Sequence, residues 1–255
     1  MSSSSNALIS TMQYHNGLNS GALSLLDVVA AARRLNSAGI EIRPDYWRDK
    51  ENDIVAVRRA ASEQGLQVVY ATMTTLFAPD AAGEERLRQD IDDAVALGSP
   101  LLRIFQGAAP DDTDDPAWDR ARQAVAYAAE RGIILALENF ARAPGCRVAE
   151  IARVLDVIDS PTLRTNVDIG NYAANDEDLI AAVQRLGPWV VMSHLKDLNG
   201  TDATYLGGGS LPLPAILAEF DALPQPIIHC FEYGGGDNPD ERIAASLAYL
   251  RAGRA

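Results

Sequence analysis

The sequence predicts an α/β fold in which eight βα units close into one (β/α)8 barrel. Short runs rich in Val, Ile and Leu alternate with amphipathic segments from Ala7 to the C-terminus. The short runs are almost wholly apolar, as in parallel strands covered by helices. A length of 255 residues suits a single barrel. Because no Pro-, Ser- or Gly-rich linker divides the pattern, we expect one domain over residues 7–255 after a disordered tail at residues 1–6.

Each unit is expected to begin with a strand and to continue into a helix. The strands are expected at residues 8–13, 39–43, 67–72, 101–106, 133–138, 163–168, 190–194 and 227–232. The helices are expected near residues 23–35, 51–64, 84–97, 116–131, 148–157, 177–186, 212–222 and 239–252. Apolar residues recur at three- and four-residue spacing in several helices, as in Ile54, Val57 and Ala61.

Start and stop signals agree with these helices. Pro116 stands in a first helical turn, Asp176 precedes an acidic segment, and Asn238 precedes Pro239. Glycine can end a helix, and it follows four of the expected helices at Gly65, Gly98, Gly132 and Gly187.

An open, doubly wound parallel sheet is the alternative fold, because it also alternates strands and helices. A dinucleotide-binding sheet of that kind carries G-x-G-x-x-G after its first strand, and this chain lacks the motif there. The closed barrel is therefore favoured, with its active site at the C-terminal rim of the strands.

Composition excludes several classes of partner and location. The formal charge of −13 and the pI near 4.6 argue against nucleic acid, although a local basic site remains compatible with them. Only Cys146 and Cys230 occur, which indicates a reducing cytoplasm rather than a disulfide framework. The opening MSSSSN resembles no signal peptide, and no apolar run reaches the roughly 18 residues of a membrane span.

Four chelating side chains end four successive apolar runs. Glu138 closes IILALE, Asp168 closes LRTNVD, His194 closes WVVMSH and Glu232 closes PIIHCFE. The intervals between them are 30, 26 and 38 residues, each long enough for one helix and the next strand. In a closed barrel the C-terminal ends of neighbouring strands meet at one rim, so the four side chains are expected to converge.

Three carboxylates and one imidazole predict a site for a divalent cation. Mn²⁺ or Mg²⁺ is favoured, and Co²⁺, Fe²⁺ or Zn²⁺ also fits. Each residue alone has a simpler explanation, since a carboxylate at a strand end often caps the next helix and a lone His often lies in a core. Four such residues in order on consecutive strands favour the metal site.

The chain resembles the sugar phosphate isomerase/epimerase superfamily of xylose isomerase-like TIM barrels over essentially its whole length from Ala7. The resemblance is carried by GIEIR (39–43), LALEN (135–139), NVDIGN (166–171), HLKD (194–197), LGGGSLPLPAIL (206–217) and FE (231–232). It implies that Glu138, Asp168, His194 and Glu232 hold the metal. It also implies that Glu138 and Glu232 move protons on opposite sides of a substrate.

That chemistry leads to a metal-dependent isomerase or epimerase of a small keto-sugar or sugar phosphate. A cation chelated by a carbonyl and its neighbouring hydroxyl acidifies the adjacent C–H, and two carboxylates then permit removal and return of the proton on opposite faces. The same enediolate could lose a β-hydroxyl, so a dehydratase of a cyclic keto-polyol such as inosose or dehydroshikimate is the alternative. A barrel that binds a sugar or metal without turnover is a second alternative.

Departures from the motifs of individual members argue against two specific activities, those of a free-hexulose 3-epimerase and of endonuclease IV. Free-hexulose 3-epimerases carry an N-R-aromatic-E stretch after the fifth-strand Glu and a His three residues after the sixth-strand Asp. Here residues 139–145 read NFARAPG and Asn171 takes the place of that His. Endonuclease IV needs many histidines for three metals, whereas this chain has three in all.

Four further residues are expected to contact the substrate. They are Glu41, Arg103, Gln106 and Lys196. Glu41 could instead pair with Arg43 or Arg103, and Lys196 with Asp197. Arg142 is a further candidate for an anionic group, and the glycines at 207–209 could offer backbone N–H groups to an anion or act as a hinge. His229 alternates to the other face of its strand and is excluded from the site. A homo-oligomer is possible.

Overall fold

Eight parallel strands close into a barrel in the computed structural model, which describes residues 7–140 and 143–253. The strands follow the ring order β1-β10-β7-β6-β5-β4-β3-β2, and β1 pairs with both β2 and β10. The expected fold is confirmed, and the open-sheet alternative is wrong. The expected tail at residues 1–6 and the candidate Arg142 lie outside the described residues.

The barrel strands lie close to their expected positions. They are β1 (Leu8–Ser10), β2 (Gly39–Ile42), β3 (Gln67–Phe77), β4 (Leu101–Gly107), β5 (Ile134–Glu138), β6 (Leu163–Asp168), β7 (Val190–Leu195) and β10 (Ile228–Phe231). The first strand was expected to reach Gln13, but Ser10 ends it. The Ser10 hydroxyl accepts a hydrogen bond from the Met12 N–H and starts a 3₁₀ helix at Thr11–Tyr14.

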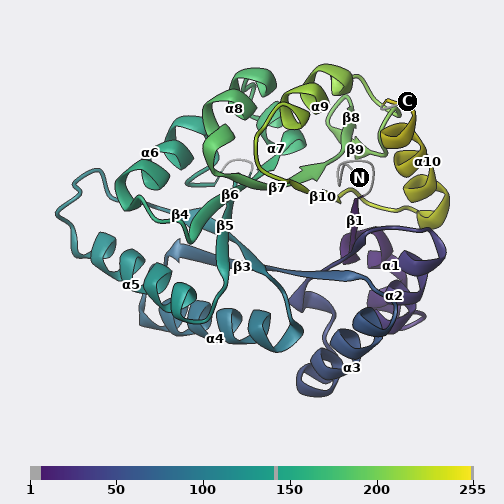
Figure 1. Ribbon diagram of the computed structural model, residues 1–255, viewed down its shortest axis with the longest axis horizontal. Helices are drawn as coiled ribbons and strands as arrows, with labels where there is room; N and C mark the ends of the chain where they lie inside the picture. Colours follow the sequence, from purple (N-terminus) through teal and green to yellow (C-terminus); the bar gives the residue numbers. More distant parts are fainter. Residues whose placement is uncertain (1–6, 141–142, 254–255) are drawn as a thin grey trace.

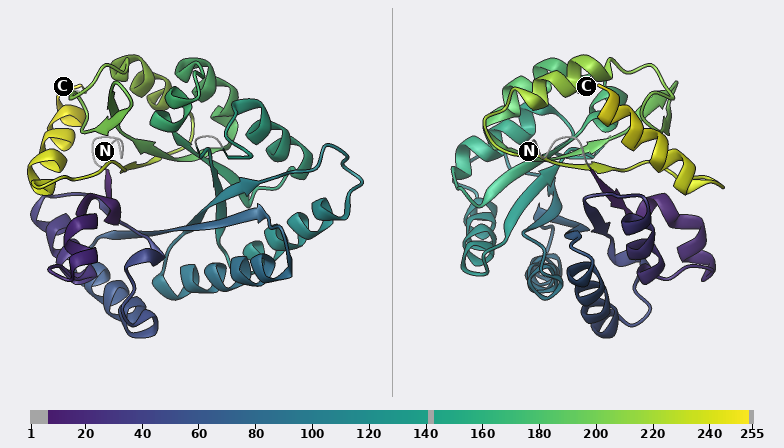
Figure 2. Two further views of the ribbon diagram at one scale, coloured as in Figure 1. Left: turned by 180° about the vertical axis from the view of Figure 1, so that it is seen from behind. Right: turned by 45° about the vertical axis from the view of Figure 1, so that its right-hand side comes forward.

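The expected helices surround the strands (Figures 1 and 2). They are α2 (Leu25–Arg34), α3 (Lys50–Glu63), α4 (Ala81–Leu97), α5 (Pro116–Glu130), α6 (Val148–Ile158), α8 (Leu179–Leu186), α9 (Leu213–Asp221) and α10 (Pro239–Ala252). One expected signal was wrong, because Asp178 rather than Asp176 caps α8. Gly187 follows the last residue of α8 as expected, with a φ of −39°, and it begins a 3₁₀ turn.

Several short elements in the loops were not expected. They are α1 (His15–Ser20), α7 (Ile169–Ala174), 3₁₀ turns at Pro44–Tyr46 and Gly187–Trp189, and a hairpin of β8 (Asp197–Asn199) and β9 (Asp202–Thr204). Elements this short carry too few residues to show a hydrophobic period. Apart from the Gly187–Trp189 turn, all of them follow the C-terminal ends of strands, so they help to build the rim.

Alternation along the strands sorts the side chains into two environments. On β5, Leu135 and Leu137 pack outward against helices, whereas Ala136 faces the barrel interior. The interior layer at this level is apolar and consists of Leu8, Val69, Leu101, Ala136, Met192 and Cys230. Because side chains alternate with a period of two, the next inward position on β5 after Ala136 is Glu138. The interior therefore changes from apolar to charged toward the C-terminal rim.

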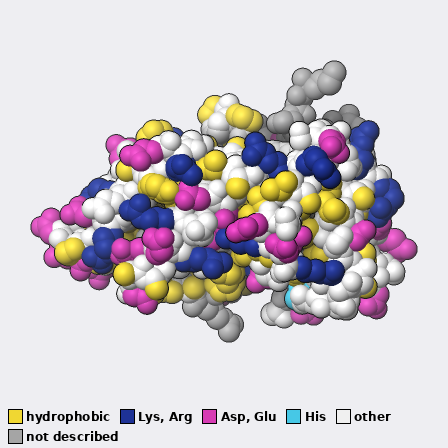
Figure 3. Space-filling model, turned by 90° about the horizontal axis from the view of Figure 1, so that it is seen from below, with side chains coloured by type: hydrophobic (Ala, Val, Ile, Leu, Met, Phe, Trp, Pro, Cys, Tyr) yellow, Lys and Arg dark blue, Asp and Glu magenta, His cyan; other side chains and the backbone are white. Residues whose placement is uncertain are grey.

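The molecular surface mixes charges of both signs. On the face shown in Figure 3, basic and acidic side chains are interspersed with small apolar patches. The excess negative charge of the chain is therefore not gathered into one acidic patch on this face. In the described part of the chain, every helix is too short or too polar to cross a membrane.

Candidate metal centre

The four expected metal ligands converge at the C-terminal end of the barrel interior. One ligand atom from each of Glu138, Asp168, His194 and Glu232 lies within 4.8 Å of the others. Glu138, Asp168 and His194 are at most 2% exposed, and the Glu232 side chain is 11% exposed. A buried group of three carboxylates is costly unless positive charge compensates it, so the site requires cations.

His194 presents one ring nitrogen to the three carboxylates. Its Nδ1 lies 3.3 Å from Glu138, 3.7 Å from Asp168 and 3.6 Å from Glu232. This buried nitrogen has no hydrogen-bond partner among the described residues. An unpartnered imidazole nitrogen facing three carboxylate oxygens is a donor set that fits a divalent cation such as Mn²⁺ or Mg²⁺.

Glu41 fixes the other nitrogen of the same ring. Its Oε2 lies 2.7 Å from His194 Nε2, and both side chains are fully buried. Burial opposes the charge of Glu41, but His194 and Arg103 outweigh it and lower its pKa. Since an ionised carboxylate can only accept, Nε2 carries a proton and donates it, so Nδ1 is the nitrogen that faces the metal position. Burial opposes the charge of His194, but Glu41, Glu138 and Glu232 outweigh it and raise its pKa, so a metal ion would take the place of a proton on Nδ1. Glu41 was expected to contact substrate or pair with arginine; the structure pairs it with His194.

Replacing Glu41 by Gln is expected to weaken metal binding. The uncharged amide is a weaker acceptor for Nε2–H and no longer selects one tautomer of His194. We expect the dissociation constant for Mn²⁺ to rise by about 10- to 100-fold, measured by competition with a fluorescent chelator. Glu63→Gln, at an exposed glutamate on α3, is the matched control. Equal affinities for the two variants would contradict this role.

Glu138 forms a buried ion pair with the guanidinium of Arg103. Arg103 Nε lies 2.8 Å from Glu138 Oε2, and Arg103 Nη1 donates to the Thr72 carbonyl at 2.7 Å. Asn166 and Asn171 donate to the two oxygens of the same carboxylate at 3.1 and 3.4 Å. Arg103 was expected to bind substrate, but its side chain is 1% exposed and is engaged with Glu138.

Asp168 serves two purposes with its two oxygens. Oδ1 accepts from the Asn171 N–H at 2.9 Å and caps α7. Oδ2 faces His194 and Lys196. Asn139 clamps the backbone here, since it donates to the Asp168 carbonyl and accepts from the Asp168 N–H, each at 2.9 Å. The helix cap, which was the simpler explanation for this residue, is present, and it leaves the second oxygen directed toward the cluster.

Glu232 lies between two cationic side chains. Lys196 Nζ is 2.8 Å from Glu232 Oε2, and Arg43 Nη1 is 3.4 Å from Oε1. Burial opposes ionisation, but Lys196, His194 and Arg103 outweigh it and hold the pKa of Glu232 well below its ordinary value. Glu232 is therefore ionised at neutral pH and can accept a proton.

Some expected residues lie apart, and some contributing residues were missed. Gln106 is buried beside Gly107 and outside the cluster. His229 packs on the outer face as expected, with its Nδ1 2.7 Å from Ser193 Oγ and its ring against Phe220 of α9. Arg43, which was expected only as an alternative partner of Glu41, contacts Glu232 instead. The LALEN and NVDIGN motifs contain the three asparagines that support the site: Asn139, Asn166 and Asn171.

The glycine segment at 207–209 is anchored rather than free. Asp197 Oδ2 accepts from the Gly207 and Gly209 N–H groups at 3.1 and 3.0 Å, and its Oδ1 accepts from Leu198 and Leu211 at 2.9 and 3.0 Å. A Cβ on Gly209 would lie 2.2 Å from the Leu198 carbonyl oxygen. The N–H groups of Gly207 and Gly209 are thus engaged by Asp197 and are not available to an external anion.

Removing the Asp197 carboxylate is expected to release this loop. Asp197→Ala leaves four backbone N–H groups without their acceptor, which should cost about 2 kcal/mol or more of unfolding free energy. Urea denaturation measures the loss, and hydrogen exchange should speed up over residues 206–211. Asp202→Ala, at an exposed position in the same hairpin, should change neither. Unaltered exchange in Asp197→Ala would show that the loop is held by other contacts.

A cavity of about 320 Å³ opens between the loops that follow β1 and β10. Its lining residues are Met12, Gln13, His15, Asn16, Gly234, Gly235, Gly236 and Arg242. The two loops touch closely, since a Cβ on Gly235 would lie 1.9 Å from the Gln13 carbonyl oxygen. A side chain at position 235 would therefore force this wall of the rim apart.

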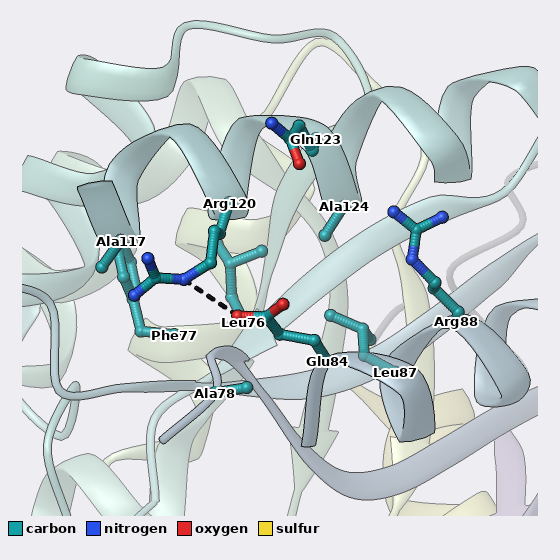
Figure 4. Close-up of a pocket in the computed structure, with 10 residues that line it drawn as sticks. All are labelled: Leu76, Phe77, Ala78, Glu84, Leu87, Arg88, Ala117, Arg120, Gln123 and Ala124. Atoms are coloured by element: carbon teal, nitrogen blue, oxygen red, sulfur yellow. Dashed lines mark ion pairs between the residues drawn. The ribbon is translucent and has the colours of Figure 1, made fainter. Parts of the chain in front are cut away.

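A second, smaller cavity has no connection with the cluster. It has a volume of about 30 Å³ and lies between α4 and α5, where Arg120 and Glu84 form an ion pair at 2.9 Å (Figure 4). Its walls come from the end of β3 and the outer helices, and they contain none of the four candidate ligands.

Comparisons with known proteins agree with this architecture. A family model described as a xylose isomerase-like TIM barrel matches residues 29–253. A search of curated proteins gave no match. Among solved structures, the probable 3-DHS dehydratase AsbF of Bacillus anthracis, involved in petrobactin synthesis, has a TM-score of 0.78 at 17% identity and covers 96% of this chain and 98% of its own.

Two epimerase structures are similar to a comparable degree. An L-ribulose 3-epimerase has a TM-score of 0.78 at 15% identity, covering 99% of this chain and 94% of its own. A D-allulose 3-epimerase from Methylomonas sp. has a TM-score of 0.75 at 17% identity, covering 99% and 100%. At these identities the likeness establishes the fold, and the reaction has to be argued from the site.

Proposed function

Because the chain belongs to the xylose isomerase-like TIM barrel family, we propose that it is a divalent-metal-dependent isomerase or epimerase of a small keto-sugar or sugar phosphate. One observation carries the proposal: two glutamates from separated strands lie beside one imidazole, whose Nδ1 faces both and has no hydrogen-bond partner among the described residues. Family membership supports an enzyme of this general kind, and the side-chain geometry supports the choice of reaction.

Glu138, Asp168, His194 and Glu232 are the proposed metal ligands, with Mn²⁺ or Mg²⁺ favoured by the three carboxylates. A divalent cation held there would draw charge from a substrate carbonyl and its neighbouring hydroxyl, and so stabilise an enediolate. The side chains that would hold the cation are already buried, and Glu41 fixes the orientation of the His194 ring. Buried ligands exclude water and raise the strength of every charge interaction at the site.

Glu138 and Glu232 are the proposed acid–base pair. Glu138 ends β5 and Glu232 follows β10, and β6 and β7 stand between these strands in the ring. A substrate lying across the rim would therefore meet the two carboxylates from different sides. One glutamate would remove a proton from the substrate carbon, and the other would donate a proton to the opposite face. The configuration of that carbon would be inverted, which is epimerisation.

Proton exchange in D2O tests this function directly. Protein stripped with a chelator and reloaded with Mg²⁺ or Mn²⁺ is incubated with ketopentoses, ketohexoses, their phosphates, an inosose and dehydroshikimate. We expect metal-dependent deuterium uptake at the carbon next to a carbonyl, with its hydroxyl retained. Proton NMR measures the uptake. A chelated sample is the control.

The other outcomes separate the alternatives. Loss of the neighbouring hydroxyl as water, seen as a conjugated-enone absorbance, would select the dehydratase. Stabilisation of the fold by a sugar without any exchange would select a binding barrel and overturn the proposed catalysis.

A further inference from the structure

The chain contains only two lysines, Lys50 and Lys196, among its 22 basic residues. The other 20 are arginines. Lys50 lies in α3 and is 35% exposed, whereas Lys196 is 7% exposed and lies at the metal centre. A buried lysine in so arginine-rich a chain indicates a place where a compact ammonium is needed and a planar guanidinium does not fit.

The Lys196 ammonium contacts two of the proposed metal ligands at the atoms that face the metal position. Its Nζ lies 2.7 Å from Asp168 Oδ2 and 2.8 Å from Glu232 Oε2. The same two oxygens lie 3.7 and 3.6 Å from Nδ1 of His194. The ammonium and a metal ion would therefore draw on the same pair of oxygens.

Gly170 holds the stem of Lys196 in this direction. A Cβ built on Gly170 would lie 2.4 Å from Lys196 Cδ and 2.6 Å from Cγ. The lysine stem thus packs directly on the backbone of α7, at the one residue type that leaves room for it. Any larger residue at position 170 would push the stem away from Asp168 and Glu232.

A count of charges around the centre shows what Lys196 contributes. Glu41, Glu138, Asp168 and Glu232 supply four carboxylates, and they are met by the basic side chains of Arg43, Arg103 and Lys196. With a metal ion in place of the proton on Nδ1, the His194 imidazole is neutral, and without Lys196 four carboxylates would then face two guanidiniums. That excess of two negative charges matches the two positive charges of a divalent cation.

We propose that Lys196 is the internal counter-ion of the metal centre, which holds Asp168 and Glu232 together in the metal-free protein and is displaced when a divalent cation binds. The inference rests on the metal site of the proposed function. It makes Lys196 a positioning residue that sets metal affinity and keeps the ligands in place until the metal arrives.

Lysine-specific NMR observes the displacement in the wild-type protein. Protein labelled with ¹⁵N-lysine should give two side-chain ammonium signals, and Lys50→Met removes one and so assigns both. On titration of chelator-treated protein with Mg²⁺, we expect the Lys196 signal to shift or broaden while the Lys50 signal stays constant. A Lys196 signal that is unchanged at saturating Mg²⁺ overturns the proposal.

Metal affinity and stability provide the second measurement. Lys196→Met should bind Mn²⁺ roughly tenfold or more tightly, because the competing ammonium is gone. In chelator it should melt at a lower temperature than the wild type, and Mn²⁺ should restore most of the difference. Lys50→Met, which also loses an ion pair with a carboxylate, Asp93, should keep the wild-type affinity.

Gly170→Ala tests the same idea with the lysine still present. By pushing the stem aside, it should raise Mn²⁺ affinity in the same direction as Lys196→Met, so the test does not depend on one variant folding well. Equal or weaker affinity in both variants overturns the counter-ion role while leaving the metal centre intact. If neither wild type nor variants bind a divalent cation, the metal centre of the proposed function is wrong and the inference falls with it.

Discussion

Glu232→Gln is expected to abolish epimerisation while the protein remains folded. The amide keeps the size of the side chain and one oxygen near the metal position, but it cannot accept a proton. Loss of one acid–base group lowers turnover by about 10²- to 10⁴-fold. The rate is measured at saturating metal, because Glu232 is also a proposed ligand and a weaker metal site would imitate the loss.

The matched variant is Glu138→Gln, and the two should fail in opposite ways. Each retains one proton acceptor on one side of the substrate. Each should therefore still exchange the C–H of one epimer in D2O without converting it, and the exchanged epimer should differ between the variants. Full turnover in Glu232→Gln, or exchange of the same epimer by both variants, would contradict the division of labour between the two glutamates.

Arg103→Met is expected to be the most destabilising change in the metal-free protein. Arg103 and Glu138 form an ion pair at 2.8 Å with side chains 1% and 2% exposed, so its loss leaves a buried carboxylate without its main cation. Breaking a buried pair in this way costs about 3–5 kcal/mol. Urea denaturation in chelator measures the cost, and Mn²⁺ should recover part of it by supplying positive charge to Glu138.

Two comparisons show whether the cost comes from the unpaired carboxylate. Arg185→Met removes an exposed pair with Asp156 and should cost no more than about 1 kcal/mol. The double variant Arg103→Met/Glu138→Gln removes both charges and should regain much of the stability lost in Arg103→Met. A single Arg103→Met variant as stable as Arg185→Met would mean that Arg103 does not compensate Glu138.

The barrel and the four candidate ligands were readable from the sequence because both depend on short-range patterns. Apolar runs alternate with periodic helical segments, and a polar residue at the end of an apolar run marks where a buried strand reaches the rim. Glu138, Asp168, His194 and Glu232 each stand at such an end. Chain order along a parallel barrel then places the four strands next to one another.

The roles of the surrounding charges depend on approaches that sequence order does not fix. Glu41 and His194 are 153 residues apart, and nothing in the local sequence of either indicates that β2 brings a carboxylate to the far nitrogen of that ring. Arg103 and Lys196 were expected to face the substrate. Only the packed interior shows that the charged groups of these two side chains form ion pairs with Glu138, Asp168 and Glu232.

The sequence by itself thus determined the fold, the approximate positions of the strands and the set of candidate metal ligands, because hydrophobic periodicity and residue type are local properties of the chain. The tertiary structure decided which charge compensates which, including the Glu41–His194 pair and the ammonium of Lys196 between two ligands. The physical reason is that the energy of a buried charge depends on its nearest partners in space, and these come from strands that meet only when the barrel closes.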